Sequence, residues 1–185
     1  MKIAVTGHKS GIGKAIYTLL GQSHTVIGFD LDTVNIENSE DRKSIIEQSK
    51  DCDIFINNAY ARSHQLNMFD DILLDWKDND SKYIINIGSI MQYKVNTGSQ
   101  NDDVVLFPPQ YINSKKDLRK KTVTNSLNSE IKCKLSIVQP GFTRTQMIAD
   151  MEISDVQLEP VDVALQLKYI IESNLHFIEI TFSRR

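Results

Sequence analysis

The chain has 185 residues, with 21 lysines and arginines against 24 aspartates and glutamates, and a formal net charge of −3. This length predicts one domain spanning residues 1–185. Without a basic surplus, neither nucleic acid nor an anionic membrane is an expected partner, and no apolar stretch approaches the roughly 20 residues that cross a bilayer. Cys52 and Cys133 lie far apart near apolar segments, so we expect two reduced thiols, no metal site and a cytoplasmic protein.

Short apolar runs alternate with amphipathic stretches from one end of the chain to the other. In chain order, the runs predict strands over residues 2–6, 24–29, 34–36, 53–57, 82–88, 135–139 and 177–182. The stretches between them predict helices over residues 12–20, 40–49, 66–76, 110–127 and 161–172. This alternation predicts a Rossmann-type α/β fold, with a doubly wound parallel sheet and helices on both faces.

The loop after the first predicted strand has the sequence T-G-H-K-S-G-I-G. Gly7, Gly11 and Gly13 suit a strand-to-helix turn in which the backbone bends sharply and approaches a pyrophosphate without a Cβ in the way. The N–H groups and the dipole at the start of the following helix favour phosphate. The loop therefore predicts a dinucleotide site. Its other predicted contacts are Lys9, Ser10 and Ile12.

Asp30 ends the second predicted strand, about 20 residues after the glycine loop, which is the usual distance for an acid that binds the adenosine ribose. Its carboxylate would accept hydrogen bonds from ribose hydroxyls and repel a 2′-phosphate, so NAD(H) is favoured over NADP(H). Lys9 argues for the opposite choice, because a loop cation is able to contact a 2′-phosphate. Asp30 is alternatively a turn residue at a strand end.

Tyr111 and Lys115 lie four residues apart on a predicted helix and so project from one face. A phenol with a pKa of about 10 is a poor acid or base at neutral pH. A nearby ammonium is expected to lower that pKa, toward the range of efficient proton transfer. Ser89 follows the fifth predicted strand, where ligands bind in open α/β sheets. Its hydroxyl would donate to a substrate carbonyl oxygen, so the three side chains predict a proton-transfer site.

Together these motifs resemble the short-chain dehydrogenase/reductase family over nearly the whole chain. The resemblance also rests on the runs P-G-F-T-R-T and E-P-V-D-V-A, which start at Pro140 and Glu159. It implies that Ser89, Tyr111 and Lys115 are catalytic, that Tyr111 and Lys115 also bind the cofactor, with Lys115 on the nicotinamide ribose hydroxyls, and that Asn57 braces the sheet. The further cofactor contacts that it implies are Ile36, Asn58, Ala59, Pro140, Gly141, Thr143 and Thr145.

The chain departs from the family's pattern in several places. Residues 34–36 follow the second strand so closely that the family's helix between these strands is expected to be missing. Asn67 is the candidate for the catalytic helix Asn that organises a proton-relay water, or else a residue of the helix start. Tyr60 stands where the family usually has glycine. We expect the segments 90–109 and 146–155 to shape a substrate pocket whose ligand the sequence does not identify.

The resemblance implies an NAD(P)(H)-dependent oxidoreductase that interconverts a carbonyl and an alcohol on a small molecule, with Tyr111 as acid and base. An epimerase or dehydratase of sugar nucleotides remains open because the segment from Ser89 to Tyr111 is long, although the short C-terminal region counts against it. A non-catalytic dinucleotide-binding regulator also remains open. From the family's habit we expect a homodimer or homotetramer formed through the helices at 66–76 and 110–127.

Overall fold

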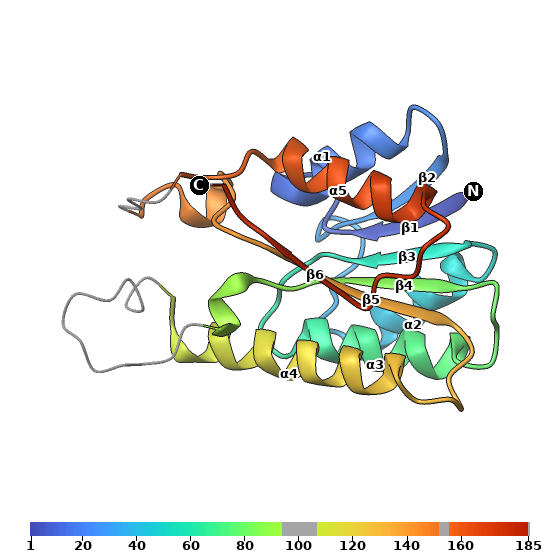
Figure 1. Ribbon diagram of the computed structural model, residues 1–185. Coiled ribbons are helices and arrows are strands. Elements are labelled where there is room, and N and C mark those ends of the chain that lie inside the picture. Colours follow the sequence, from blue (N-terminus) through green and yellow to red (C-terminus); the bar gives the residue numbers. More distant parts are fainter. Residues whose placement is uncertain (94–106, 152–155, 185) are drawn as a thin grey trace.

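Six parallel strands form one central sheet, in the order β2-β1-β3-β4-β5-β6 (Figure 1). The structure, a computed structural model, describes residues 1–93, 107–151 and 156–184. The strands are β1 (Lys2–Thr6), β2 (Thr25–Phe29), β3 (Ile54–Asn57), β4 (Tyr83–Ile87), β5 (Lys134–Pro140) and β6 (Glu179–Phe182). Every neighbouring pair is parallel, which confirms the predicted Rossmann-type α/β fold.

Helices cover both faces of the sheet. They are α1 (Gly11–Leu20), α2 (Ser39–Ser49), α3 (His64–Trp76), α4 (Pro109–Ser126) and α5 (Pro160–Glu172), with the short 3₁₀ turns η1 (Ile90–Tyr93) and η3 (Gln146–Ile148). Helices α1 and α5 lie side by side on one face, and α2, α3 and α4 lie on the other (Figure 1). The five helices predicted from periodicity are all present, each with ends displaced by no more than two residues.

Each face of the sheet buries its own apolar cluster. Ile3 and Val5 of β1 pack against α1 and α5, whereas Ala4 between them faces α2 and α3, as the two-residue period of a strand requires. On that second face, Phe55 meets Trp76 edge to face, with ring centres 6.1 Å apart. All five residues of β4 are buried, which confirms that this strand is covered on both sides.

The strand predicted at residues 34–36 is wrong. These residues form no strand, and β2 lies at the edge of the described sheet. The chain turns directly after β2, because the N–H groups of Thr33 and Val34 both donate to the carbonyl oxygen of Asp30 at 2.9 Å. The turn leads the apolar residues away from the sheet edge, and Ile36 packs in the cluster under α2 instead.

Two further expectations concern the cysteines and the membrane. Cys52 and Cys133 are both buried and free, which confirms the prediction of two unpaired thiols. Among the helices that the structure describes, none is long and apolar enough to cross a membrane.

The parallel order brings the carboxyl ends of β1, β3, β4 and β5 to one edge of the sheet. In open α/β sheets this edge is where ligands bind. The loops that leave it carry the glycine motif, Asn58, Ser89 and the segment 140–145. Residues from distant parts of the sequence are therefore collected at one place.

Candidate functional site

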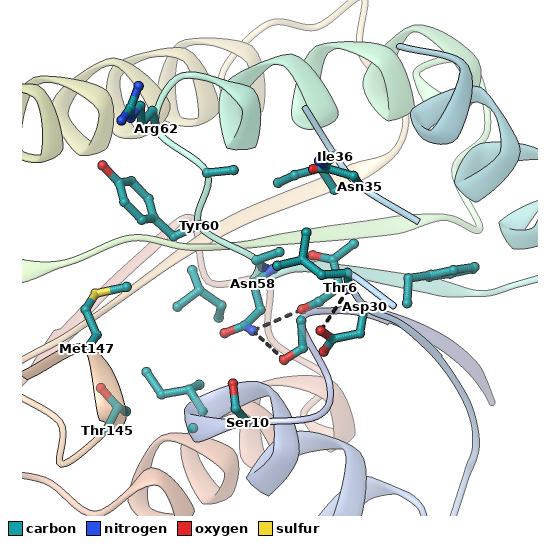
Figure 2. Close-up of a pocket in the computed structure, with 18 of the residues that line it drawn as sticks. Thr6, Ser10, Asp30, Asn35, Ile36, Asn58, Tyr60, Arg62, Thr145 and Met147 are labelled. Atoms are coloured by element: carbon teal, nitrogen blue, oxygen red, sulfur yellow. Dashed lines mark hydrogen bonds between the residues drawn. The ribbon is translucent and has the colours of Figure 1, made fainter. Parts of the chain in front are cut away.

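An elongated cavity of about 510 Å³ lies at this edge, lined by the glycine loop, by the loops after β2 and β3, and by side chains of α4. Its volume falls within the range of about 300–1,000 Å³ that is typical of small-molecule and cofactor sites. Asp30 and Ile36 lie toward one end of the cavity, and Tyr60 and Thr145 lie toward the other (Figure 2). Asn58 lies between the two ends.

The backbone of the glycine loop requires glycine. Gly7 and Gly11 have φ angles of +71° and +48°, where a side chain is strained. A Cβ atom on Gly13 would overlap the carbonyl oxygen of Gly7 and crowd the Asn58 amide. Ser10 is the N-cap of α1, and within the described chain its side chain makes no capping hydrogen bond. Its hydroxyl and the first N–H groups of α1 are therefore available to a phosphate.

Asn58 joins the loop after β3 to the glycine loop. Its Nδ2 donates to the carbonyl oxygens of Thr6 at 3.0 Å and Gly7 at 3.3 Å (Figure 2). In return, Thr6 Oγ1 accepts from the N–H groups of Asn58 and Ala59, each at 3.0 Å. This part of the cavity lining is thus fixed by Asn58, which the sequence analysis assigned to cofactor binding, and by Thr6, which it did not.

The Asp30 carboxylate is oriented by two backbone groups. Its Oδ2 accepts from the N–H of Lys9 at 2.8 Å, and its Oδ1 accepts from the N–H of Leu31 at 2.9 Å. Each oxygen keeps a second acceptor site. The Lys9 ammonium pairs with Asp32 and lines a separate outer groove. Glu37 adds a second carboxylate to the cavity lining near Asp30.

Tyr111 and Ser89 meet at the other end, where a smaller cavity of about 70 Å³ adjoins the large one. Burial raises the pKa of Tyr111, and the side-chain hydrogen bond with Ser89 opposes this rise only in part. Ser89 Oγ also accepts from the N–H of Met91 at 3.2 Å. Tyr111 is therefore a neutral phenol at neutral pH.

Lys115, one helical turn after Tyr111 on α4, is only 4% exposed. Its Nζ donates to Gln65 Oε1 at 2.7 Å and to the carbonyl oxygen of Ile87 at 2.9 Å, and it lies 5.7 Å from the ring centre of Tyr111. Burial lowers the pKa of Lys115 to about 7.

The prediction that Lys115 lowers the pKa of Tyr111 is wrong for this state of the chain. Both groups lose solvent, so the phenol and the amine are each pushed toward the neutral form. A half-neutralised amine several ångströms from the phenol ring centre cannot offset that cost. Sequence spacing gave the common face of the two residues correctly, but it contains no information on burial.

Asn67 is not part of this group. Its Nδ2 contacts His64 Nδ1 at 3.4 Å on α3, and among the described residues it forms no hydrogen bond with the Ser/Tyr/Lys set. The side chain that contacts Lys115 is Gln65, two positions before Asn67 on the same helix. Sequence reasoning missed Gln65. The available signal was a polar residue followed by Met68, Phe69 and Ile72, which mark the buried face of α3.

Aromatic rings enclose Tyr111. Phe107 stacks on it, with ring centres 4.7 Å apart and planes inclined by 25°. Tyr60 meets it edge to face at 4.9 Å, and Phe142 stacks behind Phe107 at 6.2 Å. The ring of Tyr60 also lies 5.2 Å from the Lys115 amine. The expected glycine position thus carries a ring that covers the proton-transfer pair.

The remaining predicted contacts divide between the two cavities. The large cavity is lined by Gly7, Ser10, Gly11, Ile12, Asp30, Ile36, Asn58, Ala59, Tyr111, Lys115 and Thr145. The smaller cavity is lined by Ser89, Pro140, Gly141 and Thr143 and shares Ile12, Tyr111 and Thr145 with it. Gly13 lines neither cavity, and its part is to allow the close approach of α1 to the Gly7 carbonyl oxygen. Much of the expected substrate wall, residues 94–106 and 152–155, lies outside the described residues.

Asn57 confirms its expected role as a brace. Its Nδ2 donates to Asn86 Oδ1 at 2.8 Å and to the main-chain oxygen of Gln65 at 2.9 Å. Asn86 in turn donates to Thr122 Oγ1 of α4 at 2.9 Å. A buried chain of polar groups therefore links α3, the ends of β3 and β4, and the helix that carries Tyr111 and Lys115.

No family model matches the chain, and no curated protein is similar to it in sequence. Solved structures are similar in fold. A 3-alpha-hydroxysteroid dehydrogenase from Pseudomonas sp. B-0831, complexed with NADH, has a TM-score of 0.76 and 18% identity, over 99% of this chain and 95% of that chain. A short chain dehydrogenase from Burkholderia cenocepacia J2315, in complex with NADP, has a TM-score of 0.74 and 18% identity, over 97% and 86%.

A third structure, the 3-ketoacyl-(acyl-carrier-protein) reductase from Brucella melitensis complexed with NADH, has a TM-score of 0.75 and 14% identity, over 98% of this chain and 96% of that chain. The chain has the fold of the short-chain dehydrogenases. At these identities the similarity shows the fold, and the chemistry has to be argued from the site of this chain.

Proposed function

We propose that the chain is an NAD(P)(H)-dependent oxidoreductase that interconverts a carbonyl and an alcohol. The observation that carries the proposal is one continuous site, in which a glycine loop built for phosphate lies at one end and the Ser89, Tyr111 and Lys115 group lies at the other. A purely structural strand-to-helix turn would not explain the buried polar group facing it. The solved structures of the same fold that were compared above carry NADH or NADP.

The residues of the large cavity fit a nicotinamide dinucleotide. The positive φ angles of Gly7 and Gly11 and the exclusion of a Cβ at Gly13 leave the backbone open to a pyrophosphate. Asp30 would hold the adenosine ribose, and Thr145 would lie beside the nicotinamide. When bound, that group supplies or accepts the hydride, which is cofactor chemistry.

The protein's own residues would handle the proton and the substrate oxygen. Ser89 and Tyr111 both line the smaller cavity, and Ser89 acts on the pKa of Tyr111 through its side chain, so a carbonyl oxygen placed between the two hydroxyls would accept from both. In reduction, the proton of the Tyr111 hydroxyl moves to that oxygen as the carbonyl carbon gains hydride, and an alcohol results. Burial raises the pKa of Tyr111, so the hydroxyl carries the proton needed for reduction at neutral pH but is a weaker acid than a free phenol.

Tyr111→Phe tests this proposal. The substitution removes the proton and keeps the ring stacked between Phe107 and Tyr60, so turnover should fall by about 10²–10⁴-fold while NADH binding is retained. The measurement is reduction of a panel of small aldehydes and ketones, alongside NADH fluorescence titration. Tyr169→Phe, which removes a hydroxyl from an exposed ring on α5, is the matched control. Near-parental turnover of Tyr111→Phe would place the proton donor elsewhere.

NAD(H) rather than NADP(H) is the cofactor that we propose. Asp30 and Glu37 both line the adenosine end and would repel a 2′-phosphate, whereas the Lys9 cation is engaged by Asp32. Asp30→Asn should raise NADPH affinity relative to NADH, since it removes charge and keeps the shape. Separate titrations with the two nucleotides measure the ratio. Tighter binding of NADPH by the parent protein would contradict the assignment.

The sugar-nucleotide and regulator alternatives are separated by one measurement. Net consumption of added NADH with a carbonyl substrate supports the oxidoreductase, because an epimerase or dehydratase returns its hydride and a regulator transfers none. Self-association through α3 and α4 stays a prediction. Most apolar side chains of these two helices are buried against the sheet, and Leu74 is the large apolar residue that α3 exposes. A cytoplasmic location and the lack of a nucleic-acid partner also stay predictions from composition.

A further inference from the structure

Gln65 is a buried amide at the start of α3 with a complete set of partners. It is 2% exposed. Its Nε2 donates to the carbonyl oxygens of Asn57 at 2.9 Å and Ile87 at 3.0 Å, and its Oε1 accepts from Lys115 Nζ at 2.7 Å. Its own main-chain oxygen accepts from Asn57 Nδ2 at 2.9 Å. Gln65 and Asn57 therefore hold each other in both directions.

These partners fix which way the amide points. In the opposite orientation, the amide oxygen would face two carbonyl oxygens and the NH₂ group would face the amine of Lys115. Both contacts would be repulsive, because carbonyl oxygens only accept and an ammonium only donates. The Gln65 carbonyl therefore has to point at Lys115.

Among the described residues, the Lys115 amine is surrounded by oxygens and aromatic rings without a compensating charge. Its Nζ faces the rings of Tyr60 at 5.2 Å and Tyr111 at 5.7 Å, together with the Gln65 and Ile87 oxygens. In the described part of the chain, no carboxylate forms an ion pair with it. Two of its N–H positions are occupied by these oxygens, and Lys115 also lines the large cavity. The third position is left for that cavity.

We propose that Gln65 is the positioning residue of Lys115, whose side-chain carbonyl fixes the amine against the Tyr60 and Tyr111 rings and directs its free N–H into the cofactor cavity. This role rests on the proposed function, since the free N–H would be used on a ribose hydroxyl. The side chain of Gln65 holds the amine by a direct hydrogen bond. An uncharged acceptor stabilises the ammonium without locking it in that form, as a carboxylate would.

Gln65→Met tests the proposal, because methionine keeps the length of the side chain and lacks the carbonyl. Losing an acceptor that favours the ammonium should lower the titration midpoint of Lys115 by about one unit, the size expected from one hydrogen bond to a charged group. NMR of protein labelled at the lysine ε-carbons measures that midpoint, and Lys115→Met identifies the signal. NADH affinity should fall by about three- to tenfold for the same lost bond.

Gln65→Leu is the second variant and should also move the midpoint downward, because leucine offers the amine no oxygen acceptor. It keeps the proposal testable if the methionine variant fails to fold. Gln48→Met is the matched control. This amide on α2 is exposed and donates to Ser44 Oγ at 3.0 Å, so neither the midpoint nor the affinity should change.

A purely structural role for Gln65 would lower Tm and leave the Lys115 midpoint and the NADH affinity at parental values. That result overturns the proposal. An effect of Asn67→Leu on the midpoint that equals or exceeds the effect of Gln65→Met would overturn it too, in favour of Asn67. Failure of the parent protein to reduce any carbonyl would count against the proposed function alone, because the NMR midpoint needs no turnover.

Discussion

Replacing Lys115 by methionine is expected to stabilise the protein at neutral pH. Burial lowers the pKa of Lys115 from 10.5 to about 7, so the folded chain binds this proton less tightly than the unfolded chain does. By linkage, the resulting destabilisation is fully present below pH 7, and it is relieved as the pH rises from 7 toward 10.5. Lys115→Met removes the titrating group and nearly preserves the length of the side chain.

The magnitude follows from the size of the shift and from the lost contacts. A depression of about 3.5 units corresponds to a cost of about 4–5 kcal/mol near pH 7. The substitution also leaves Gln65 Oε1 without its donor, which costs about 1–3 kcal/mol. The carbonyl oxygen of Ile87 keeps its bond from Gln65 Nε2. The net gain is about 1–4 kcal/mol, or several degrees in Tm for a chain of this size.

Urea unfolding of the parent and the variant between pH 6.5 and 8.5 measures this effect. The stability difference between the two proteins should shrink by about 1 kcal/mol for each pH unit above 7. The packing cost of methionine does not depend on pH, so the slope isolates the amine. Lys116→Met, at the exposed neighbouring position, is the control and should give a pH-independent difference. A constant difference for Lys115→Met would refute the reasoning.

Two other substitutions test the walls of the site. Gly13→Ala should weaken NADH binding at least tenfold, because its Cβ overlaps the Gly7 carbonyl oxygen and displaces the Asn58 amide; unchanged affinity in a fluorescence titration would contradict the assignment of the loop. Tyr60→Gly removes the ring that lies 4.9 Å from Tyr111, so the ratio of kcat/KM for a bulky ketone to that for a small one should rise. An unaltered ratio would mean that Tyr60 does not limit access.

The fold and the turn of the glycine loop were predictable because their causes are local. Alternating periods of two and about 3.6 residues locate strands and helices, and a glycine that must adopt a positive φ, as Gly7 and Gly11 do, marks a turn. The error at residues 34–36 has a local cause as well. Three apolar residues are compatible with a strand, but the turn closed on the Asp30 carbonyl decides where they pack.

For the Ser89, Tyr111 and Lys115 group, the sequence predicted that Tyr111 and Lys115 share a helix face, but it did not predict how burial shifts their pKa values. The spacing of Tyr111 and Lys115 fixes a shared helix face. Whether the ammonium reaches the phenol depends on what else binds the amine, and that partner, Gln65, comes from another helix 50 positions away in sequence. The sequence analysis named Asn67 and did not consider Gln65 for the same reason, because only the packing of α3 against β3 and α4 shows which amide faces inward.

The burial of Lys115 is also the best argument that this site is functional. Charged side chains are almost never fully buried without a partner of opposite charge, yet the described surroundings of Lys115 offer only carbonyl oxygens and aromatic rings. A hydrophobic residue at this position would give a more stable fold, which is why Lys115→Met is expected to have a larger free energy of unfolding than the parent protein. Sites that keep a destabilising residue are those where function requires it. A buried amine without an ion pair among the described residues, beside a buried phenol at one end of the cavity, is therefore better explained by the proton chemistry that we propose than by structure alone.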